Sequence, residues 1–362
     1  MQLRTLWQKF AAPIDPPLMT MSLILLGFAL LVVSSASADR LGAQFFNMLV
    51  ALLVMRVTAQ ISPQKLMYFA LPVFVGGLLL LVAVALFGDV SKGARRWLNL
   101  GFMRIQPSEI MKIAMPLMLA WYFQRHETYL RLREYVVAAL ILLLPVALIA
   151  KQPDLGTAIL VLAAGFYVIF LAGLSWKVLA GLVVAGVAMA PLAWTMMRDY
   201  QRSRILTLLD PEADPLGKGF HIIQSTIAIG SGGILGKGWG QGTQAQLEFI
   251  PERHTDFIFA VLSEEFGLIG STLLLILYAL LIGRGMMIAA NAPTLFTRLL
   301  AGSITLIFFT YAFVNMGMVS GILPVVGIPL PFVSYGGTSL TTLFLGIGIL
   351  MSIHKHRMLV QK

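Results

Sequence analysis

The stretch LEFIPERHTDFIFAVLSEE, residues 247–265, joins two kinds of sequence and shows how the chain is organised. On its N-terminal side lies a long polar segment, 198–254, and on its C-terminal side begins an apolar run that continues to residue 282. Asp256 stands at the junction, where we expect water to give way to hydrocarbon. An ionisable side chain at membrane depth costs about 2.5–3.5 kcal/mol or more, so a carboxylate in this place indicates a function.

Outward from this stretch the chain consists of one apolar run after another. Of its residues 58% are hydrophobic and 12% charged, with a mean hydropathy of +0.86, which is typical of an integral membrane protein. Runs long enough for a bilayer, about 17 to 25 residues, occur at 18–35, 43–60, 67–87, 107–123, 135–151, 156–173, 176–196, 256–282, 298–321 and 333–353. We predict an all-α integral membrane protein with about ten transmembrane helices. We expect 1–362 to form a single polytopic membrane domain, with 198–254 as a large extracytoplasmic loop between spans 7 and 8.

The basic residues predict the orientation of these spans. With a cytoplasmic N-terminus, Arg4 and Lys9 and most basic residues of the short connections fall on the cytoplasmic side, as the positive-inside rule requires. Both termini are then cytoplasmic. Residues 1–37 imitate a cleavable signal peptide, but the many spans that follow favour an uncleaved first span.

Composition and motifs exclude several kinds of partner and site. The net charge is +10, but the basic residues are scattered between spans, so we expect anionic lipid or lipid phosphate as the partner and no nucleic acid. The chain has no cysteine, and its histidines have no metal-site spacing, so no dedicated metal site is predicted. The glycine-rich stretch 227–244 lacks the phosphate-loop pattern, which leaves ATP binding unsupported, and is expected to be a flexible outer loop able to follow an extended ligand.

Two outer connections carry more cations than the orientation rule favours. Residues 88–106 hold Lys92, Arg95, Arg96 and Arg104, and the large loop holds Arg198, Arg202, Arg204, Lys218, Lys237 and Arg253. Arginine grips phosphate bidentately, and Trp97 suits headgroup depth, so these cations favour a lipid-linked phosphate. The alternative is that long loops cross the membrane regardless of charge and that neighbouring acids neutralise the cations.

Three charged residues begin predicted spans near the outer surface. Pro107 starts a helix, and Glu109 and Lys112 then lie three residues apart on one face. They can form an internal ion pair, or Lys112 can neutralise a diphosphate while Glu109 keeps it charged and positioned. Similarly, we expect Pro153 to open a helix with Asp154 in its first turn, where the carboxylate either complements the helix dipole or contributes to a polar site.

Asp256 is the strongest candidate for chemistry. A carboxylate at the boundary of the hydrocarbon can act as a general base toward a sugar or alcohol hydroxyl, with His254 or Arg253 adjusting its charge. The alternative role is a helix cap. Glu264 and Glu265, about two turns deeper, are expected to bind other spans or a polar cavity.

A proline-rich segment, 315–340, precedes the last span. Pro324, Pro329 and Pro331 stand among glycines, which predicts a broken or re-entrant segment, although an ordinary proline-rich turn is the alternative. The polar residues that we expect to line a cavity there are Asn315, Ser320, Ser334, Tyr335 and Thr338.

Several motifs together resemble one family. The segments SKGARRWL (91–98), QPSEIMKIA (106–114), QPDLGTAI (152–159), PERHTDFIFAVLSEE (251–265) and GILPVVGIPLPFVSYGG (321–337) are similar to those of the SEDS proteins, named for shape, elongation, division and sporulation. The resemblance covers nearly the whole chain and is closer to the rod-shape-determining branch than to the division branch. Members are ten-span peptidoglycan glycosyltransferases of the bacterial cytoplasmic (inner) membrane.

The resemblance implies a substrate, partners and site residues. Lipid II and undecaprenyl-linked glycan are the implied substrates, and the implied partners are a class B penicillin-binding protein, which supplies transpeptidation, and other elongation-complex proteins. Asp256 matches the essential outer aspartate, while Glu109, Lys112 and Asp154 match further charged positions. We expect Arg95, Arg96, Arg202, Arg204 and His254 to join these residues around the substrate and its diphosphate. A divalent cation, Mg²⁺ or Mn²⁺, is the one cofactor left open.

Other functions fit the same features. A lipid II flippase would use intramembrane charges and broken helices as a translocation path, a division paralogue would carry out the same reaction elsewhere in the cell, and a scaffold would have no activity. A flippase needs polar groups through the full depth of the bilayer, whereas Glu109, Asp154 and Asp256 gather near one surface. The sequence therefore favours catalysis at the outer face.

Overall fold

The computed structural model describes residues 14–91, 94–99, 104–127, 130–215, 217, 219–250 and 252–360. Four basic residues named above lie outside these ranges: Arg4, Lys9, Lys92 and Lys218. Residues 1–13, the charged start of the segment that imitates a signal peptide, also lie outside them.

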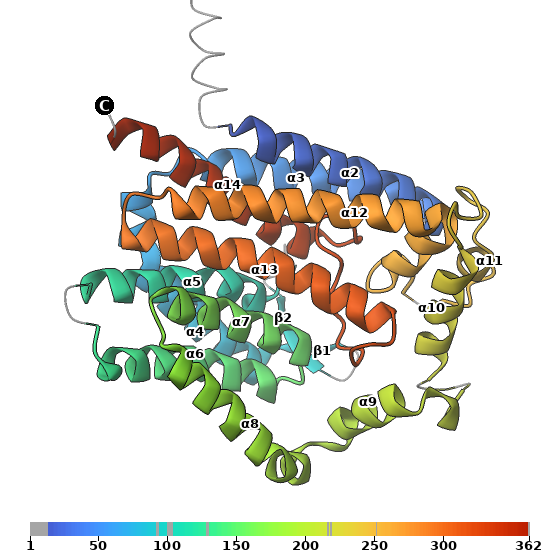
Figure 1. Ribbon diagram of the computed structural model, residues 1–362, viewed down its shortest axis with the longest axis horizontal. Coiled ribbons are helices and arrows are strands. Elements are labelled where there is room, and N and C mark those ends of the chain that lie inside the picture. The colour runs from blue at the N-terminus through green and yellow to red at the C-terminus, as the bar shows by residue number, and fades with distance from the viewer. Residues whose placement is uncertain are drawn as a thin grey trace, which may run out of the picture.

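Long helices account for most of the described chain and lie roughly side by side in Figure 1. One helix corresponds to each predicted span: α2 (Pro16–Ala36), α3 (Leu41–Thr58), α4 (Pro63–Phe87), α5 (Pro107–Arg125), α6 (Leu132–Lys151), α7 (Leu155–Leu171), α8 (Trp176–Met196), α12 (Ile258–Ala290), α13 (Leu295–Val319) and α14 (Gly337–Val360). Within the described ranges, 8 helices are long and apolar enough to cross a membrane. The two others are α7, which is shorter, and α5, which carries several charges. The helical membrane fold is confirmed, while a count of ten spans stays a prediction.

The centre of the molecule is α13, which packs against α12, α7 and α5. The short 3-10 helix η1 (Ala38–Arg40) joins α2 to α3. At the opposite extreme, α8 buries none of its residues against the rest of the described chain and extends away from the other helices in Figure 1. The charged candidates on α5 and α7 therefore face a closely packed interior and not lipid.

The connection 88–106 contains a small sheet that the all-α prediction missed. β1 (Asp89–Ser91), β2 (Ala94–Asn99) and β3 (Arg104–Ile105) pair antiparallel in that order. Strands this short give no periodic signal in the sequence, and the charges of the segment resemble those of an ordinary loop. The sheet matters because neighbouring strand residues point to opposite faces, which separates Arg95 from Arg96.

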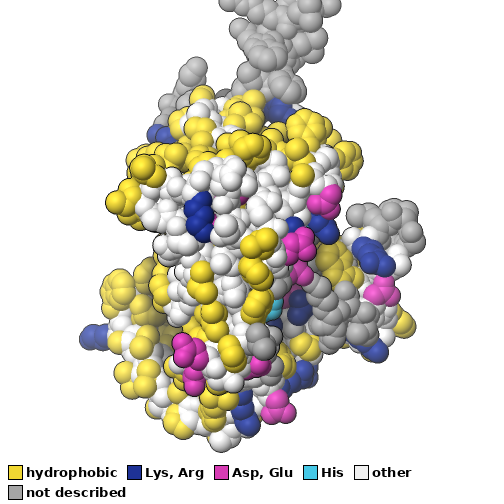
Figure 2. Space-filling model, turned by 90° about the vertical axis from the view of Figure 1, so that its right-hand side faces the viewer, with side chains coloured by type: hydrophobic (Ala, Val, Ile, Leu, Met, Phe, Trp, Pro, Cys, Tyr) yellow, Lys and Arg dark blue, Asp and Glu magenta, His cyan; other side chains and the backbone are white. Residues whose placement is uncertain are grey.

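The large polar segment is folded and not an extended loop. It forms α9 (Asp199–Leu209), the 3-10 helix η2 (Pro211–Ala213), α10 (Phe220–Ser231) and α11 (Thr243–Gln246). These elements gather at one end of the molecule, on the right of Figure 1. Figure 2 looks onto this end, where acidic and basic side chains collect between hydrophobic ones.

The glycine-rich stretch fills a break in α12, a role that the sequence did not suggest. Gly267 has φ 61° and ψ −156°, which interrupts the helix. The carbonyls of 264–265 accept hydrogen bonds from the N–H groups of 237–238, at 3.0 Å each, and the N–H groups of 268–269 donate to the carbonyls of 233–234, at 2.9 and 3.2 Å. The expectation of a flexible loop is wrong for 233–238, because their backbone replaces the hydrogen bonds that the broken helix lacks, while contact with an extended ligand stays a prediction.

Glu264 and Glu265 fix this arrangement. Glu264 is 0% exposed, and its carboxylate accepts hydrogen bonds from the Lys237 ammonium at 2.6 Å and the Thr243 hydroxyl at 3.1 Å. Glu265 accepts a hydrogen bond from the Ser35 hydroxyl at the end of α2. Glu264 thus binds the large polar segment, and Glu265 binds α2.

The segment between α13 and α14 is irregular and enters the core, as the prolines predicted. Residues 322–336 form no helix, yet Ile328, Leu330, Phe332 and Val333 are all at most 1% exposed. Freed backbone groups are tolerated at membrane depth only where protein or a cavity satisfies them. This segment therefore lies against other parts of the protein, and its contacts define the site below.

Candidate active site

Asp256 lies in the turn just before α12 and is half-buried. The N-cap of α12 is Phe257 and has no side-chain cap hydrogen bond, so the helix-cap alternative for Asp256 is wrong. The side chain lies beside the irregular segment, because a Cβ atom built on Gly327 would be 3.4 Å from Asp256 Oδ2. The Asp256 carboxylate therefore lies against the irregular segment.

Three consecutive carbonyl groups hold the Asp256 turn in place. The carbonyl of His254 accepts from the N–H of Tyr335 at 2.8 Å, and that of Thr255 accepts from the Ser334 hydroxyl at 2.6 Å. The carbonyl of Asp256 accepts from the Asn315 amide at 2.8 Å. The predicted cavity-lining residues 315, 334 and 335 thus bind the backbone next to the candidate base.

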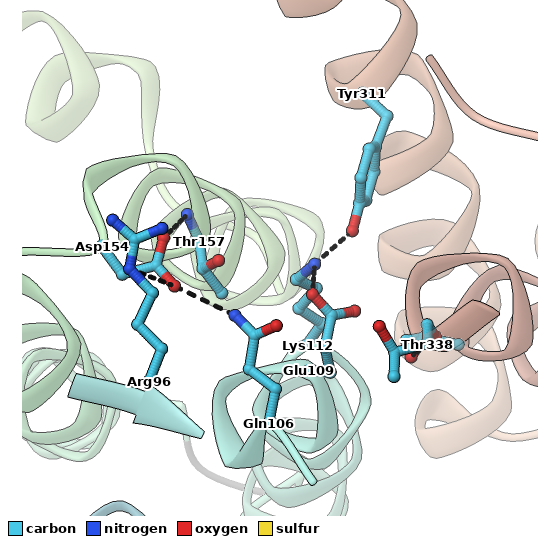
Figure 3. A network of polar contacts seen from close by, with 9 residues as sticks. Arg96, Gln106, Glu109, Lys112, Asp154, Thr157, Tyr311 and Thr338 are labelled. Carbon is cyan, nitrogen blue, oxygen red and sulfur yellow. Dashed lines mark hydrogen bonds and ion pairs between the residues drawn. The ribbon is translucent and has the colours of Figure 1, made fainter. Parts of the chain in front are cut away.

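Asp154 is the N-cap of α7, which begins at Leu155, so the expectation that Pro153 opens the helix is wrong. The Asp154 carboxylate accepts from the N–H of Thr157 at 3.2 Å, as a capping residue does, and also from the Gln106 amide at 3.1 Å. Figure 3 shows Arg96 beside the same carboxylate. Asp154 therefore caps a helix and joins a polar cluster at once.

The sheet delivers Arg96 to this cluster. The Arg96 Nε lies 3.9 Å from Asp154 Oδ2, and its Nη2 donates to the carbonyl of Pro153 at 2.6 Å. Arg95, on the other face of β2, is exposed. Of the two arginines, Arg96 faces the acids.

The irregular segment brings Asp154 and Asp256 to a common place. Gly156, at the start of α7, packs so closely on this segment that a Cβ atom would lie 2.7 Å from the carbonyl oxygen of Val326. The next residue, Gly327, has φ 76°, and a Cβ atom built on it would lie 3.4 Å from Asp256 Oδ2. The two carboxylates thus flank residues 326–328, although they are about 100 residues apart in the sequence.

Arg204, on α9, completes the charged cluster. Burial lowers the pKa of its guanidinium, Arg96 lowers it further, and the nearby Tyr200, Asp154 and Asp256 raise it. Arg204 also lines a cavity together with Val325, which places it next to the same segment. We call Arg96, Asp154, Arg204 and Asp256 the outer cluster.

A cavity opens beside Arg204. Its volume is about 230 Å³, and its lining comes from α9, α10 and the irregular segment: Tyr200, Ser203, Arg204, Thr207, Ile222 and Val325. Val325 precedes the residues that separate Asp154 from Asp256. A polar ligand in this cavity would reach the outer cluster from the outer end of the molecule.

Glu109, Lys112 and Tyr311 form a second cluster, which we call the inner cluster. Lys112 Nζ lies 2.6 Å from Glu109 Oε1 and donates to the Tyr311 hydroxyl. Glu109, Lys112 and Tyr311 are 9%, 3% and 1% exposed. The internal ion pair therefore exists, and a diphosphate contact by Lys112 stays a prediction that requires this pair to open. Figure 3 shows Arg96, Gln106 and Asp154 beside the inner cluster, with Thr338 near Glu109.

The remaining predicted site residues lie apart from the carboxylates. Arg202 donates to the carbonyls of Trp194 and Thr195, at 2.9 and 2.7 Å, where α8 ends. The His254 ring packs edge-on against Tyr335, and burial lowers the pKa of this imidazole. Arg253 binds the carbonyl of Ala36 at 2.6 Å.

Two participants were missed by the sequence analysis. Gln106 binds Asp154, and its position just before the helix-opening Pro107 was the available signal. Tyr311 is one aromatic residue within an apolar run and gave no signal. Among the described residues, no group of three or more histidines, cysteines, aspartates or glutamates is arranged to hold a metal ion.

Known proteins resemble the chain over nearly its whole length. Residues 16–359 match a family described as cell cycle proteins and named after FtsW, RodA and SpoVE. The chain is 53% identical to the peptidoglycan glycosyltransferase MrdB of Escherichia coli K12, over 99% of this chain and 98% of that protein. It superposes with a TM-score of 0.83 and 35% identity on a chain from a peptidoglycan synthase complex that coordinates polymerization and crosslinking, over 95% of this chain and 98% of that one. The rod shape determining protein RodA of Thermus thermophilus gives a TM-score of 0.73 at 30% identity, over 95% and 97%.

Proposed function

The chain belongs to the FtsW, RodA and SpoVE family of cell cycle proteins, and we propose that it polymerises lipid II with Asp256 as the general base. It is a multi-pass membrane protein and a peptidoglycan glycosyltransferase, as its 53% identity to MrdB over 99% of the chain supports. The observation that carries the assignment of the site is the convergence of Asp154, Asp256 and Arg204 on the irregular segment beside a cavity.

Asp256 accepts the proton of the 4-hydroxyl group of an incoming lipid II sugar. The hydroxyl oxygen forms a bond to the anomeric carbon of the chain linked to undecaprenyl diphosphate, and the bond from that carbon to the diphosphate oxygen breaks. The electron pair of the broken bond stays on the departing undecaprenyl diphosphate. Because the donor linkage is α and the product is β-1,4, one inverting displacement suffices, and the enzyme's main task is to position both sugars.

The cations of the outer cluster stabilise the leaving group. Arg96 and Arg204 stand beside the two carboxylates, and a guanidinium binds phosphate oxygens in pairs. Asp154 keeps Arg96 oriented until the diphosphate arrives. The inner cluster holds α5 against α13 and thereby supports the start of α5, which contributes Gln106 to Asp154.

Orientation and partners follow from the same function. With both termini cytoplasmic, the outer cluster faces the outer side of the cytoplasmic (inner) membrane, where lipid II is polymerised during cell elongation. A class B penicillin-binding protein then crosslinks the strands, in keeping with the polymerization and crosslinking coordinated in the similar synthase complex.

Glycan formation from labelled lipid II tests this function. The purified chain, together with a class B penicillin-binding protein whose own glycosyltransferase activity has been excluded, is compared with its Asp256→Ala variant. We expect polymer from the wild type and none from the folded variant, because the variant lacks the carboxylate that we propose as the base. No polymer from the wild type, with transfer of labelled lipid II across vesicle membranes instead, would favour the flippase.

A further inference from the structure

Asn315 lies in the last part of α13, is 0% exposed, and has an unusual set of contacts. Its Nδ2 donates to two backbone carbonyls, that of Asp256 at 2.8 Å and that of Ile328 at 2.7 Å. Both neighbours are acceptors, so the amide nitrogen must face them. One side chain therefore joins the turn that carries the candidate base to the irregular segment.

The two bonds span the place where the base meets that segment. Gly327, adjacent to Ile328, lies beside the Asp256 carboxylate, since a Cβ atom built on it would be 3.4 Å from Oδ2, and residues 326–328 lie against Gly156, two residues after Asp154. If the two carbonyls separate, the Asp256 carboxylate moves relative to the rest of the outer cluster. A displacement of about 1 Å can reduce a rate about 100-fold.

The two ends of the Asn315 amide are not equally satisfied. Asn315 Oδ1 is buried and has no hydrogen-bond partner among the described residues. An apolar residue of similar size would leave no unpaired oxygen at position 315, but it would deprive the carbonyls of Asp256 and Ile328 of this donor. What the amide contributes here is therefore its nitrogen, which joins the two backbone segments.

We propose that Asn315 is a positioning residue that clamps the Asp256 turn to residues 326–328 and so fixes the carboxylate for proton transfer. The clamp rests on the proposed function of Asp256 and adds a second residue on which the rate of that step depends. Asn315 does not touch the substrate, so its loss lowers kcat and leaves KM for lipid II nearly unchanged.

The test compares Asn315→Leu with Ser303→Ala in the full chain with its partner. Leu has nearly the shape of Asn but no donor. Ser303 is a matched control because it is also 0% exposed on α13 and bonds a carbonyl of another helix, that of Ala164 at 2.7 Å, far along the helix from residue 315. We expect kcat per folded molecule to fall about 10- to 100-fold in Asn315→Leu, with KM within about two-fold, and to stay at the wild-type value in Ser303→Ala.

A second variant and a reference reaction keep the outcomes distinct. If Asn315→Leu does not fold, Asn315→Ser is measured under the same criteria. A wild-type kcat per folded molecule in the folded variant, while Asp256→Asn is inactive, would overturn the clamp and leave the base assignment intact. Polymer at the wild-type rate from Asp256→Asn would instead overturn the proposed function.

Discussion

The start of α5 connects the outer and inner clusters, since Gln106 binds Asp154 and Glu109 follows in the first turn, but the two clusters differ in what surrounds them. In the inner cluster, Glu109 and Lys112 neutralise each other at 2.6 Å and are 9% and 3% exposed. In the outer cluster, Asp256 is half-buried and Arg204 lines a cavity of about 230 Å³. A buried charge that its partner neutralises therefore supports the fold, whereas a charged cluster beside a cavity is accessible to a ligand and can take part in chemistry.

Breaking the inner pair should have the largest effect on stability. Lys112→Met leaves the Glu109 carboxylate buried without its ammonium, which costs about 3–5 kcal/mol. The double variant Glu109→Gln, Lys112→Met removes both charges and should recover much of this loss. Thermal unfolding of the purified protein in detergent measures both, and a single variant with the wild-type midpoint would show that the pair does not support the fold.

Changing a cation of the outer cluster should act on binding and not on folding. Arg204→Gln removes a charge-assisted contact with the diphosphate worth about 1.5–3 kcal/mol, so we expect KM for lipid II to rise about 10- to 100-fold. Arg202→Gln should raise KM much less, because Arg202 binds carbonyls at the end of α8 instead of facing the carboxylates. Equal increases in KM for the two variants would contradict the assignment of Arg204, and not Arg202, to the outer cluster.

The smallest expected effect concerns His254. Burial lowers the pKa of its imidazole below the ordinary value of 6.5, so the folded protein favours the neutral form. As the pH falls through 6.5, the unfolded chain therefore binds more protons than the folded protein does. The free energy of unfolding then decreases until the pH reaches the lower pKa of the folded state. His254→Gln should make the unfolding midpoint less dependent on pH just below 6.5. If the pH dependence of the unfolding midpoint is unchanged in the variant, titratable groups other than His254 control it.

The sequence predicted the helices well and the site only in part. Apolar runs have the length that a bilayer imposes, so each predicted span matches a helix. No comparable length requirement applies to the short strands of 89–105, so their positions could not be predicted in this way. The approach of Asp154 to Asp256 depends on how Gly156 and Gly327 pack in three dimensions, which no local pattern encodes.

Individual charges were easier to find than their partners. Glu109 and Lys112 were identified by their spacing, and the pair exists. Tyr311, which receives the same ammonium's hydrogen bond, is distant in sequence and resembles its apolar neighbours. Asn315 and Ser334 were predicted to line a cavity of the proline-rich segment, but their hydrogen bonds to the backbone carbonyls of 255–256 became apparent only from the fold.

The rate of glycan polymerisation by Asp256→Asn, set against Asp210→Asn, tests the central claim most directly. Both changes remove one outer carboxylate charge with almost no change in shape, and Asp210 caps η2 through the N–H of Ala213 at 3.2 Å on an exposed surface. We predict that Asp256→Asn still binds lipid II but loses about 10²- to 10⁴-fold in rate, while Asp210→Asn keeps the wild-type rate. A folded Asp256→Asn protein that polymerises lipid II at the wild-type rate would contradict the claim that the outer cluster supplies the base.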